Sequence, residues 1–170
     1  MKHLWLDLED TVIEPVLNGW FNTQLIPTGI AKVKKIINEF QPDRVHVFSF
    51  AVWNEQELTR FNMGTRPRLE AALGVTFSSV PTVDDDMIPA ACKFMGLSPD
   101  RVDFEEMSNF WGKQQTFRLN LLHIYRHRAR DAEATPIEAM LVDDVVYNET
   151  FEIPQLNLKG HVLNILEYTL

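Results

Sequence analysis

Cysteine and extended apolar stretches are scarce in this chain, and each shortage excludes a class of protein. The 170 residues include a single cysteine, Cys92, so no intrachain disulfide can form and a reducing compartment is favoured. No apolar run approaches the ~20 residues that a membrane-spanning helix requires. The first residues already reach an acid at Asp7, too early for the apolar core of a secretory signal. We therefore expect a cytoplasmic protein with no membrane partner.

Basic residues are also few, which bears on the partners. Lys and Arg number 16 against 24 Asp and Glu, so the formal net charge is −8. Proteins that bind nucleic acid need a basic surface, so nucleic acid is not favoured as a partner. The hydrophobic fraction of 45% and the charged fraction of 24% are those of a globular chain rather than a disordered one. Without repeats or low-complexity tracts, the length predicts one domain over residues 1–170.

Short apolar runs that end in a polar residue dominate the pattern. Three of them cover residues 3–6, 45–48 and 139–142, and they are followed by Asp7, by Ser49 and by the pair Asp143 and Asp144. Runs this short, bounded by polar residues, are typical of buried parallel strands. The segments 75–80 and 160–165 are also predicted to be strands.

Helical spacing of apolar residues fills the intervals between these runs. It predicts helices over residues 29–40, 54–73 and 114–130. We expect Thr28 to cap the first helix and Pro67 to break or restart the second. The third ends in arginines, which complement the helix dipole at that end. Strands that alternate with helices predict an α/β fold with a mostly parallel sheet.

The polar residues that follow the predicted strands indicate where a functional site would lie. In open α/β sheets, ligands bind outside the carboxyl ends of the strands, so these side chains should converge at one edge. Several carboxylates around one pocket repel each other unless a cation or a shared proton intervenes. Oxygen ligands without clustered histidine or thiolate favour Mg²⁺ over zinc. The sequence therefore predicts an acidic site that takes Mg²⁺ and a phosphorylated substrate.

Four motifs in order resemble those of the haloacid dehalogenase (HAD) superfamily. The first is Asp7-Leu8-Glu9-Asp10-Thr11-Val12-Ile13, and the fourth is Asp143-Asp144-Val145-Val146-Tyr147-Asn148. Between them, Ser49 resembles the Ser/Thr motif and Lys113 the lysine motif. The resemblance implies a three-layer α/β/α Rossmann-like (HAD-like) fold with a mostly parallel central sheet. It also implies a Mg²⁺-dependent phosphatase that works through an aspartyl-phosphate.

The same resemblance implies a role for each motif residue. Asp7 would be the nucleophile, and Glu9 would protonate the leaving group and then activate water. Ser49 would hydrogen-bond the phosphoryl oxygens, and Lys113 would neutralise the charge of the nucleophile and the phosphate. The ligands of Mg²⁺ would be Asp7, the backbone carbonyl of Glu9, Asp144 and, in an assisting role, Asp143.

The sequence also allows predictions about substrate contacts and a lid. We expect Thr11, Ser49, Trp53 and Asn54 to contact the substrate. Too few residues separate Thr11 from Ser49 for a cap domain, so the resemblance is to an uncapped or minimally capped member. Segment 97–112, with Met107, Phe110 and Trp111, is predicted to form a small lid.

Several alternatives stay open at this point. Phosphatases of the family usually carry Asp where this chain has Glu9, and a misplacement near 1 Å can cost about 10²-fold in rate. The chain is therefore either a phosphatase or a catalytically weak or inactive binding or regulatory protein on the same fold. Asp10 is ranked below Glu9 as the acid, because adjacent strand residues point to opposite sides. Lys93 is the rival of Lys113, and a receiver-like phosphoacceptor domain is disfavoured by the motif order.

Overall fold

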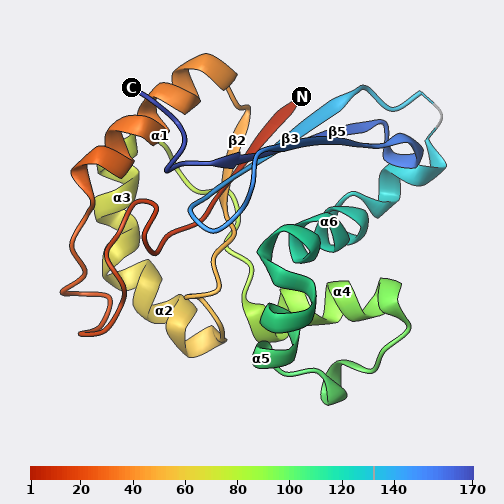
Figure 1. Ribbon diagram of the computed structural model, residues 1–170, viewed down its shortest axis with the longest axis horizontal. Coiled ribbons are helices and arrows are strands. Elements are labelled where there is room, and N and C mark those ends of the chain that lie inside the picture. Colours follow the sequence, from red (N-terminus) through yellow and green to blue (C-terminus); the bar gives the residue numbers. More distant parts are fainter. Residues whose placement is uncertain (132) are drawn as a thin grey trace.

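A mostly parallel β-sheet forms the centre of the protein. The computed structural model, which describes residues 1–131 and 133–170, arranges five strands in the order β2-β1-β3-β5-β4 (Figure 1). The strands are β1 (Lys2–Leu6), β2 (Arg44–Val47), β3 (Ile137–Asp143), β4 (Glu149–Ile153) and β5 (Leu158–Asn164). All neighbouring pairs are parallel except β4 with β5, which is antiparallel at the edge. The predicted α/β class with a mostly parallel sheet is confirmed.

Helices connect the strands. The α-helices are α1 (Pro27–Phe40), α2 (Glu55–Met63), α3 (Thr65–Leu73), α4 (Ile88–Met95), α5 (Phe104–Glu106) and α6 (Gly112–Ile124). Two π-helical segments, η1 (Val83–Met87) and η3 (Met107–Trp111), precede α4 and α6. Short 3₁₀ segments are η2 (Pro99–Arg101), η4 (Arg126–Arg130) and η5 (Pro154–Leu156). Among the described residues, no helix has both the length and the apolar character that crossing a membrane would require.

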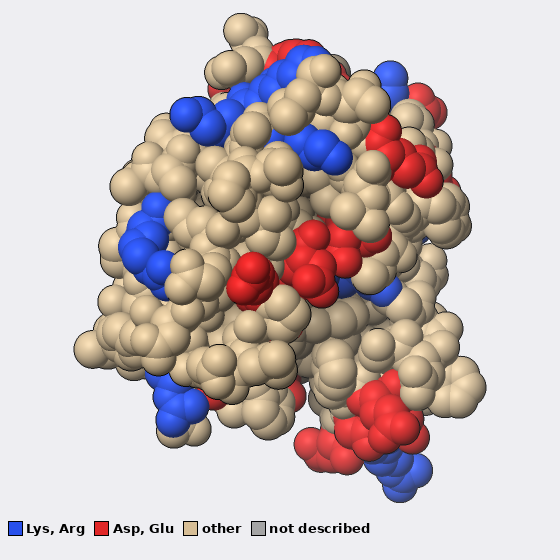
Figure 2. All heavy atoms as spheres, turned by 60° about the vertical axis from the view of Figure 1, so that its left-hand side comes forward, with Lys and Arg blue, Asp and Glu red and all other residues tan. Residues whose placement is uncertain are grey.

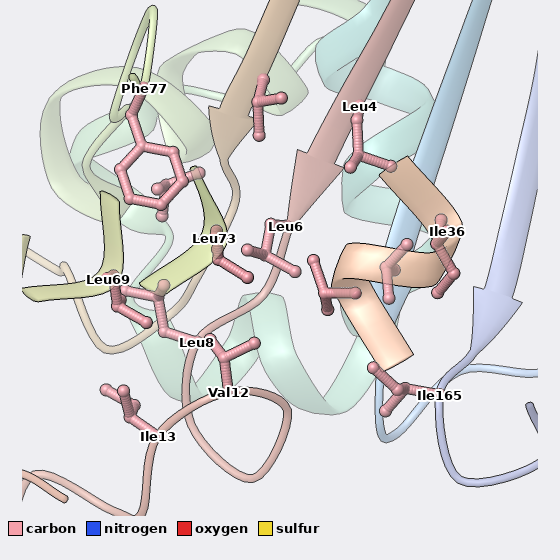
Figure 3. Packing of buried hydrophobic residues seen from close by; sticks show 14 of the residues in the cluster. Leu4, Leu6, Leu8, Val12, Ile13, Ile36, Leu69, Leu73, Phe77 and Ile165 are labelled. Carbon is pink, nitrogen blue, oxygen red and sulfur yellow. The ribbon is translucent and has the colours of Figure 1, made fainter. Parts of the chain in front are cut away.

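The strands are apolar because both faces of the sheet are covered. Leu4 and Leu6 of β1 pack in one cluster with Ile36 of α1 and with Leu69 and Leu73 of α3. Figure 3 shows these side chains pointing toward one another from the strand and the two helices. Burial on both faces explains why β1 is a continuous apolar run rather than an alternating one.

A second cluster lies against the other face of the sheet. Trp5 of β1 and Leu141 of β3 pack with Phe117 and Leu121 of α6 and with Met87 of η1. Figure 1 shows α1, α2 and α3 on one side of the sheet and α4, α5 and α6 on the other. Adjacent residues of β1 therefore belong to different clusters, as strand geometry requires.

The strand order places a crevice at the carboxyl end of β1. From β1 the chain continues to β2 on one side, and it later returns to β3 on the other side. A reversal of this kind opens a crevice at the strand ends, where ligands of α/β proteins bind. The backbone N–H of Asp7 donates to Val142 O at 3.0 Å, and that of Phe48 donates to Leu6 O at 2.8 Å. These bonds align the carboxyl ends of the three strands.

One predicted strand is wrong in extent. Segment 75–80 forms a single parallel bridge, between Val45 and Phe77, rather than a strand. The N–H of Ser78 donates to Val45 O at 2.8 Å, and the N–H of Val47 donates to Ser79 O at 3.0 Å. Its partner β2 has only four residues, and Pro81 follows, so the ladder has no room to lengthen.

Two predicted helix boundaries differ for local reasons. The 54–73 helix breaks at Gly64 and not at Pro67, which lies near the start of α3, where a missing N–H costs no intrahelical bond. A Cβ at Gly64 would lie 3.0 Å from the backbone carbon of Trp20, so close approach of the chain requires glycine there. Thr28 does not cap α1, which begins at Pro27 after Ile26 without a side-chain cap.

The predicted 114–130 helix also ends early. Helix α6 stops at Ile124, and residues 126–130 form η4. Arg126 Nη1 donates to His123 O at 2.6 Å, so it satisfies a carbonyl at the helix end. Arg128 is buried, and its Nε donates to Leu156 O at 3.1 Å. These two arginines therefore serve the fold.

Candidate functional site

A hollow of about 460 Å³ opens at the carboxyl ends of β1, β2 and β3. Its lining residues come from the strand ends, from η3 and from the start of α6: Asp7, Glu9, Asp10, Ser49, Phe50, Ala51, Ser108, Gly112, Lys113, Asp143, Asp144 and Val145. On the face drawn in Figure 2, acidic side chains gather beside a central hollow, and basic ones lie mainly toward the outline. The structure thus brings Asp7, Glu9, Ser49, Lys113, Asp143 and Asp144 together at one hollow, from segments far apart in sequence.

Lys113 joins two of these carboxylates. Its Nζ lies 2.8 Å from Asp7 Oδ1 and 2.9 Å from Asp143 Oδ2, and all three side chains are buried. The ammonium also lies 4.5 Å from the centroid of the Phe50 ring, a cation–π distance. Gly112, with φ of +68°, makes the turn that begins α6 immediately before this lysine. Lys93 is exposed on α4, so the geometry selects Lys113 between the two.

A tight loop after β1 holds the Asp7 carboxylate. Thr11 Oγ1 donates to Asp7 Oδ2 at 3.0 Å. The carbonyl of Leu8 accepts from the N–H groups of Thr11, Val12 and Ile13, which closes the loop. Thr11 is buried and orients the carboxylate; its contact with substrate stays a prediction.

Asp143 and Asp144 complete a cluster of three acids. One carboxylate oxygen from each of Asp7, Asp143 and Asp144 lies within 4.8 Å of the others. The N–H of Val145 donates to Asp143 Oδ1 at 2.8 Å. Within residues 1–131 and 133–170, the buried Asp143 Oδ2 receives no hydrogen bond of good geometry, although Lys113 lies beside it.

Burial and neighbouring charges shift the pKa values of this cluster. Burial raises the pKa of Asp7 to about 7; Lys113 opposes this rise, and Asp143 and Asp144 add to it. Burial and the Asp143 charge also raise the pKa of Asp144. Burial alone would lower the pKa of Lys113, but Asp7 and Asp143 raise it above its ordinary value. One ammonium is therefore set against three acids.

These residues fit a hard divalent cation. Three clustered carboxylates supply the oxygen ligands that Mg²⁺ prefers. A dication would offset the charge that Lys113 leaves uncompensated.

Glu9 has a fixed carboxylate at the rim of the hollow. Its Oε2 accepts from the N–H of Val16 at 2.7 Å. Asp10 also lines the hollow, so strand alternation is not a reason to rank it below Glu9. The strand has ended by this point, and Asp10 has φ of +61°, so strand alternation no longer applies. Asp10 is exposed, whereas Glu9 is half-buried.

The structure places the three remaining predicted substrate contacts, Ser49, Asn54 and Trp53, in three different positions. Ser49 is buried in the lining of the hollow, and its Oγ accepts from the N–H of Ala51 at 3.3 Å. Asn54 caps α2, where its Oδ1 accepts from the N–H of Glu57 at 2.8 Å, so its side chain is engaged in the fold. Trp53 lines a second hollow next to the first.

The predicted lid, residues 97–112, is folded into η2, α5 and η3. Ser108 and Gly112 line the acidic hollow, and Phe104 lines the neighbouring one. Phe110 and Trp111 instead line a separate hollow of about 650 Å³. The segment therefore forms one wall of the site.

Sequence reasoning missed Phe50 and Ser108 at this site. Phe50 directly follows Ser49, so its position was available, but an aromatic ring carries no catalytic signature. Ser108 reaches the hollow only because the fold makes η3 part of its wall.

No family model, curated protein or solved structure matches the chain. What bears on its function is therefore the geometry of the site and the order of its motifs.

Proposed function

We propose that this protein is a Mg²⁺-dependent phosphomonoester hydrolase of the HAD type, on a three-layer α/β/α fold. The observation that carries the proposal is the Asp7 carboxylate at the end of β1. It is held by Lys113 at 2.8 Å and Thr11 at 3.0 Å, with carboxylate oxygens of Asp143 and Asp144 within 4.8 Å. The two clusters on opposite faces of the sheet support the layered fold.

A purely structural ion pair is the simpler reading of a buried Lys–Asp contact. Such a pair is usually enclosed, because exposure to water weakens it. Here the pair, although buried, lies in the wall of a hollow of about 460 Å³ at the point where α/β sheets bind ligands. The third acid, Asp144, also leaves the group without charge balance, which a purely structural cluster would avoid.

The chain's own groups account for each step. Asp7 attacks phosphorus, the bond to the leaving oxygen breaks, and Glu9 gives that oxygen its proton. Water then attacks the aspartyl-phosphate while Glu9 takes a proton from it, which releases phosphate and restores Asp7. Lys113 and Ser49 hold the phosphoryl oxygens. Asp7, Asp144 and the backbone carbonyl of Glu9, with Asp143 assisting, would hold Mg²⁺, which would supply charge neutralisation.

Phosphate release from a panel of phosphomonoesters tests the proposal. We expect hydrolysis with Mg²⁺ that stops when the metal is chelated, and loss of hydrolysis in Asp7→Asn. Beryllium fluoride, which mimics an aspartyl-phosphate, should inhibit the wild-type protein. If no ester is hydrolysed, or if Asp7→Asn stays fully active, the assignment is wrong.

A second candidate function is a binding or regulatory module without turnover. The observation that favours it is Glu9, whose side chain is one methylene longer than the usual Asp and is tied to the N–H of Val16. This module would bind Mg²⁺ and beryllium fluoride without hydrolysing esters. Hydrolysis that appears only in Glu9→Asp would establish that the longer side chain of Glu9 prevents catalysis.

A further inference from the structure

A second hollow of about 440 Å³ adjoins the acidic one. The two share Glu9, Phe50 and Ala51 in their linings, so they lie side by side. Glu9 lies at the boundary between them. A molecule whose phosphate occupies the acidic hollow would therefore extend its other end past Glu9 into the second hollow.

Aromatic rings form the walls of this second hollow. Phe50 and Phe104 meet edge to face, with ring centroids 5.4 Å apart and an interplanar angle of 89°. Trp53 contributes another wall and is 49% exposed, and Phe104 is 40% exposed. Rings that stay this exposed inside a concave site gain most from covering by a planar apolar group.

The acids in the second hollow have partners within the chain. Glu57 Oε2 accepts from Trp20 Nε1 at 2.8 Å, and its Oε1 pairs with Arg60 Nη1 at 2.8 Å. Glu9 Oε2 accepts from the N–H of Val16. With these acids engaged, the hollow favours an uncharged ring over a cationic group.

We propose that the second hollow binds the aromatic group of an aryl phosphate, the phosphate ester of a phenol. The proposal rests on the hydrolase function proposed above and names its substrate class. An apolar cavity of about 150 Å³ already holds benzene, so a hollow of 440 Å³ accommodates a substituted ring. In the reaction, Asp7 bonds to phosphorus, the bond from phosphorus to the phenolic oxygen breaks, and Glu9 protonates the departing phenolate to a phenol.

Aryl phosphates are intrinsically more reactive than alkyl phosphates, so a comparison of substrates alone cannot test the hollow. The test is the change in their ratio between variants. We would measure kcat/KM for phenyl phosphate, ethyl phosphate and phosphocholine in the wild-type protein, in Phe104→Ala and in Phe110→Ala. Phe110 is the matched control, because it belongs to the same wall segment, is 83% exposed and lies outside both hollows.

Phe104→Ala should lower kcat/KM for phenyl phosphate about tenfold more than that for ethyl phosphate, mainly through KM, as expected for loss of ring contact. Phe110→Ala should keep the wild-type ratio. An equal loss for phenyl and ethyl phosphate, or a selective loss for phosphocholine, would overturn the proposal. If Phe104→Ala fails to fold, Trp53→Leu in the same lining carries the same expectation.

Binding separates failure of this proposal from failure of the hydrolase function. Phenyl phosphate would be titrated calorimetrically into Asp7→Asn, with and without Phe104→Ala. Saturable binding that weakens about tenfold in the double variant supports the aromatic hollow, whether or not the wild-type protein turns over any ester. Absence of saturable binding, in a protein that hydrolyses ethyl phosphate, overturns the aromatic hollow and leaves the hydrolase function intact.

Discussion

Lys113 shows at the scale of one residue how the acidic site is held together. Its ammonium lies within 3 Å of the carboxylates of Asp7 and Asp143, and burial removes water that would otherwise screen them. Loss of one partner from a buried charge cluster is costly, because the remaining charges stay buried without compensation. The lysine therefore contributes to stability as well as to the proposed chemistry.

Replacement of this lysine gives a stability prediction. Lys113→Met should lower the free energy of unfolding by about 3–5 kcal/mol, since Asp7 and Asp143 lose their cation. Urea unfolding measures the loss, and added Mg²⁺ should recover part of it by supplying positive charge. Lys93→Met, on the exposed side of α4, is the control and should change little. Equal stability of the two variants would show that the cluster does not depend on Lys113.

The acid that serves the leaving group can be identified among two neighbours. Glu9→Gln keeps a group that can accept from the Val16 N–H but removes the proton donor. It should lower kcat for ethyl phosphate by about 10²–10⁴-fold, and less for phenyl phosphate, whose leaving group needs a proton less. Asp10→Asn is the matched control, with a small expected effect. A larger loss in Asp10→Asn would transfer the role to Asp10.

At the scale of elements, the packing of α1 fixes the loop that carries Asp7. A Cβ on Gly29, in the first turn of α1, would lie 1.9 Å from Thr11 O. That oxygen belongs to the backbone, so no side-chain rotation relieves the contact. The loop of residues 8–13 can therefore pack this closely on α1 only if residue 29 is a glycine. Thr11 of this loop in turn donates a hydrogen bond to Asp7.

Gly29→Ala tests this contact. Alanine favours a helix by about 1 kcal/mol over glycine, but the clash should outweigh that gain and destabilise the protein by about 1–3 kcal/mol. Displacement of Asp7 should also lower kcat about tenfold or more. Thermal unfolding and phosphate release measure the two effects. Thr28→Ala, one residue earlier and exposed, should leave both nearly unchanged; a Gly29→Ala protein with wild-type stability and rate would contradict the packing argument.

The elements that the sequence predicts well are those with a strong local pattern. The apolar runs before Asp7, Ser49 and Asp143 became β1, β2 and β3, because burial on both faces leaves a clear signal. The break at Gly64 was missed because it depends on close approach to Trp20, a contact that no local pattern records. Segment 75–80 was overestimated because its length as a strand depends on its four-residue partner.

At the scale of the whole molecule, the two hollows differ in how well the sequence predicts them. The acidic hollow could be predicted in composition, because its charged residues follow strands whose carboxyl ends must meet. The aromatic hollow could not, since Phe104 reaches it only through the fold of residues 97–112 around the site. The sequence pattern does not show which distant apolar segments pack together. The residues that would select a substrate can therefore be identified only from the folded structure.

The folded molecule also contains a pair of histidines whose protonation is disfavoured mainly by burial. His3 of β1 and His46 of β2 are buried side by side, with His46 Nε2 3.2 Å from His3 Nδ1 and with Tyr125 Oη 2.6 Å from His3 Nδ1. Burial, followed by the His3 and Arg44 charges, lowers the pKa of His46 from 6.5 to about 3. Burial also lowers the pKa of His3; Arg44 adds to this effect and Asp43 opposes it.

This pair makes stability depend on pH with a definite sign. Below pH 6.5 the unfolded chain binds a proton at His46 and the folded protein does not. The free energy of unfolding therefore decreases as the pH is lowered, until the pH reaches the folded pKa near 3. From pH 7.5 to 5.5 the contribution of His46 is about 1.4 kcal/mol. Asp7, whose pKa is raised to about 7, acts in the opposite direction, so a difference between variants is needed. His46→Gln should lose less stability over this range than the wild-type protein, whereas the exposed His127→Gln should match the wild type in urea unfolding. Identical pH dependence in all three proteins would show that His46 titrates in the fold as it does in the unfolded chain.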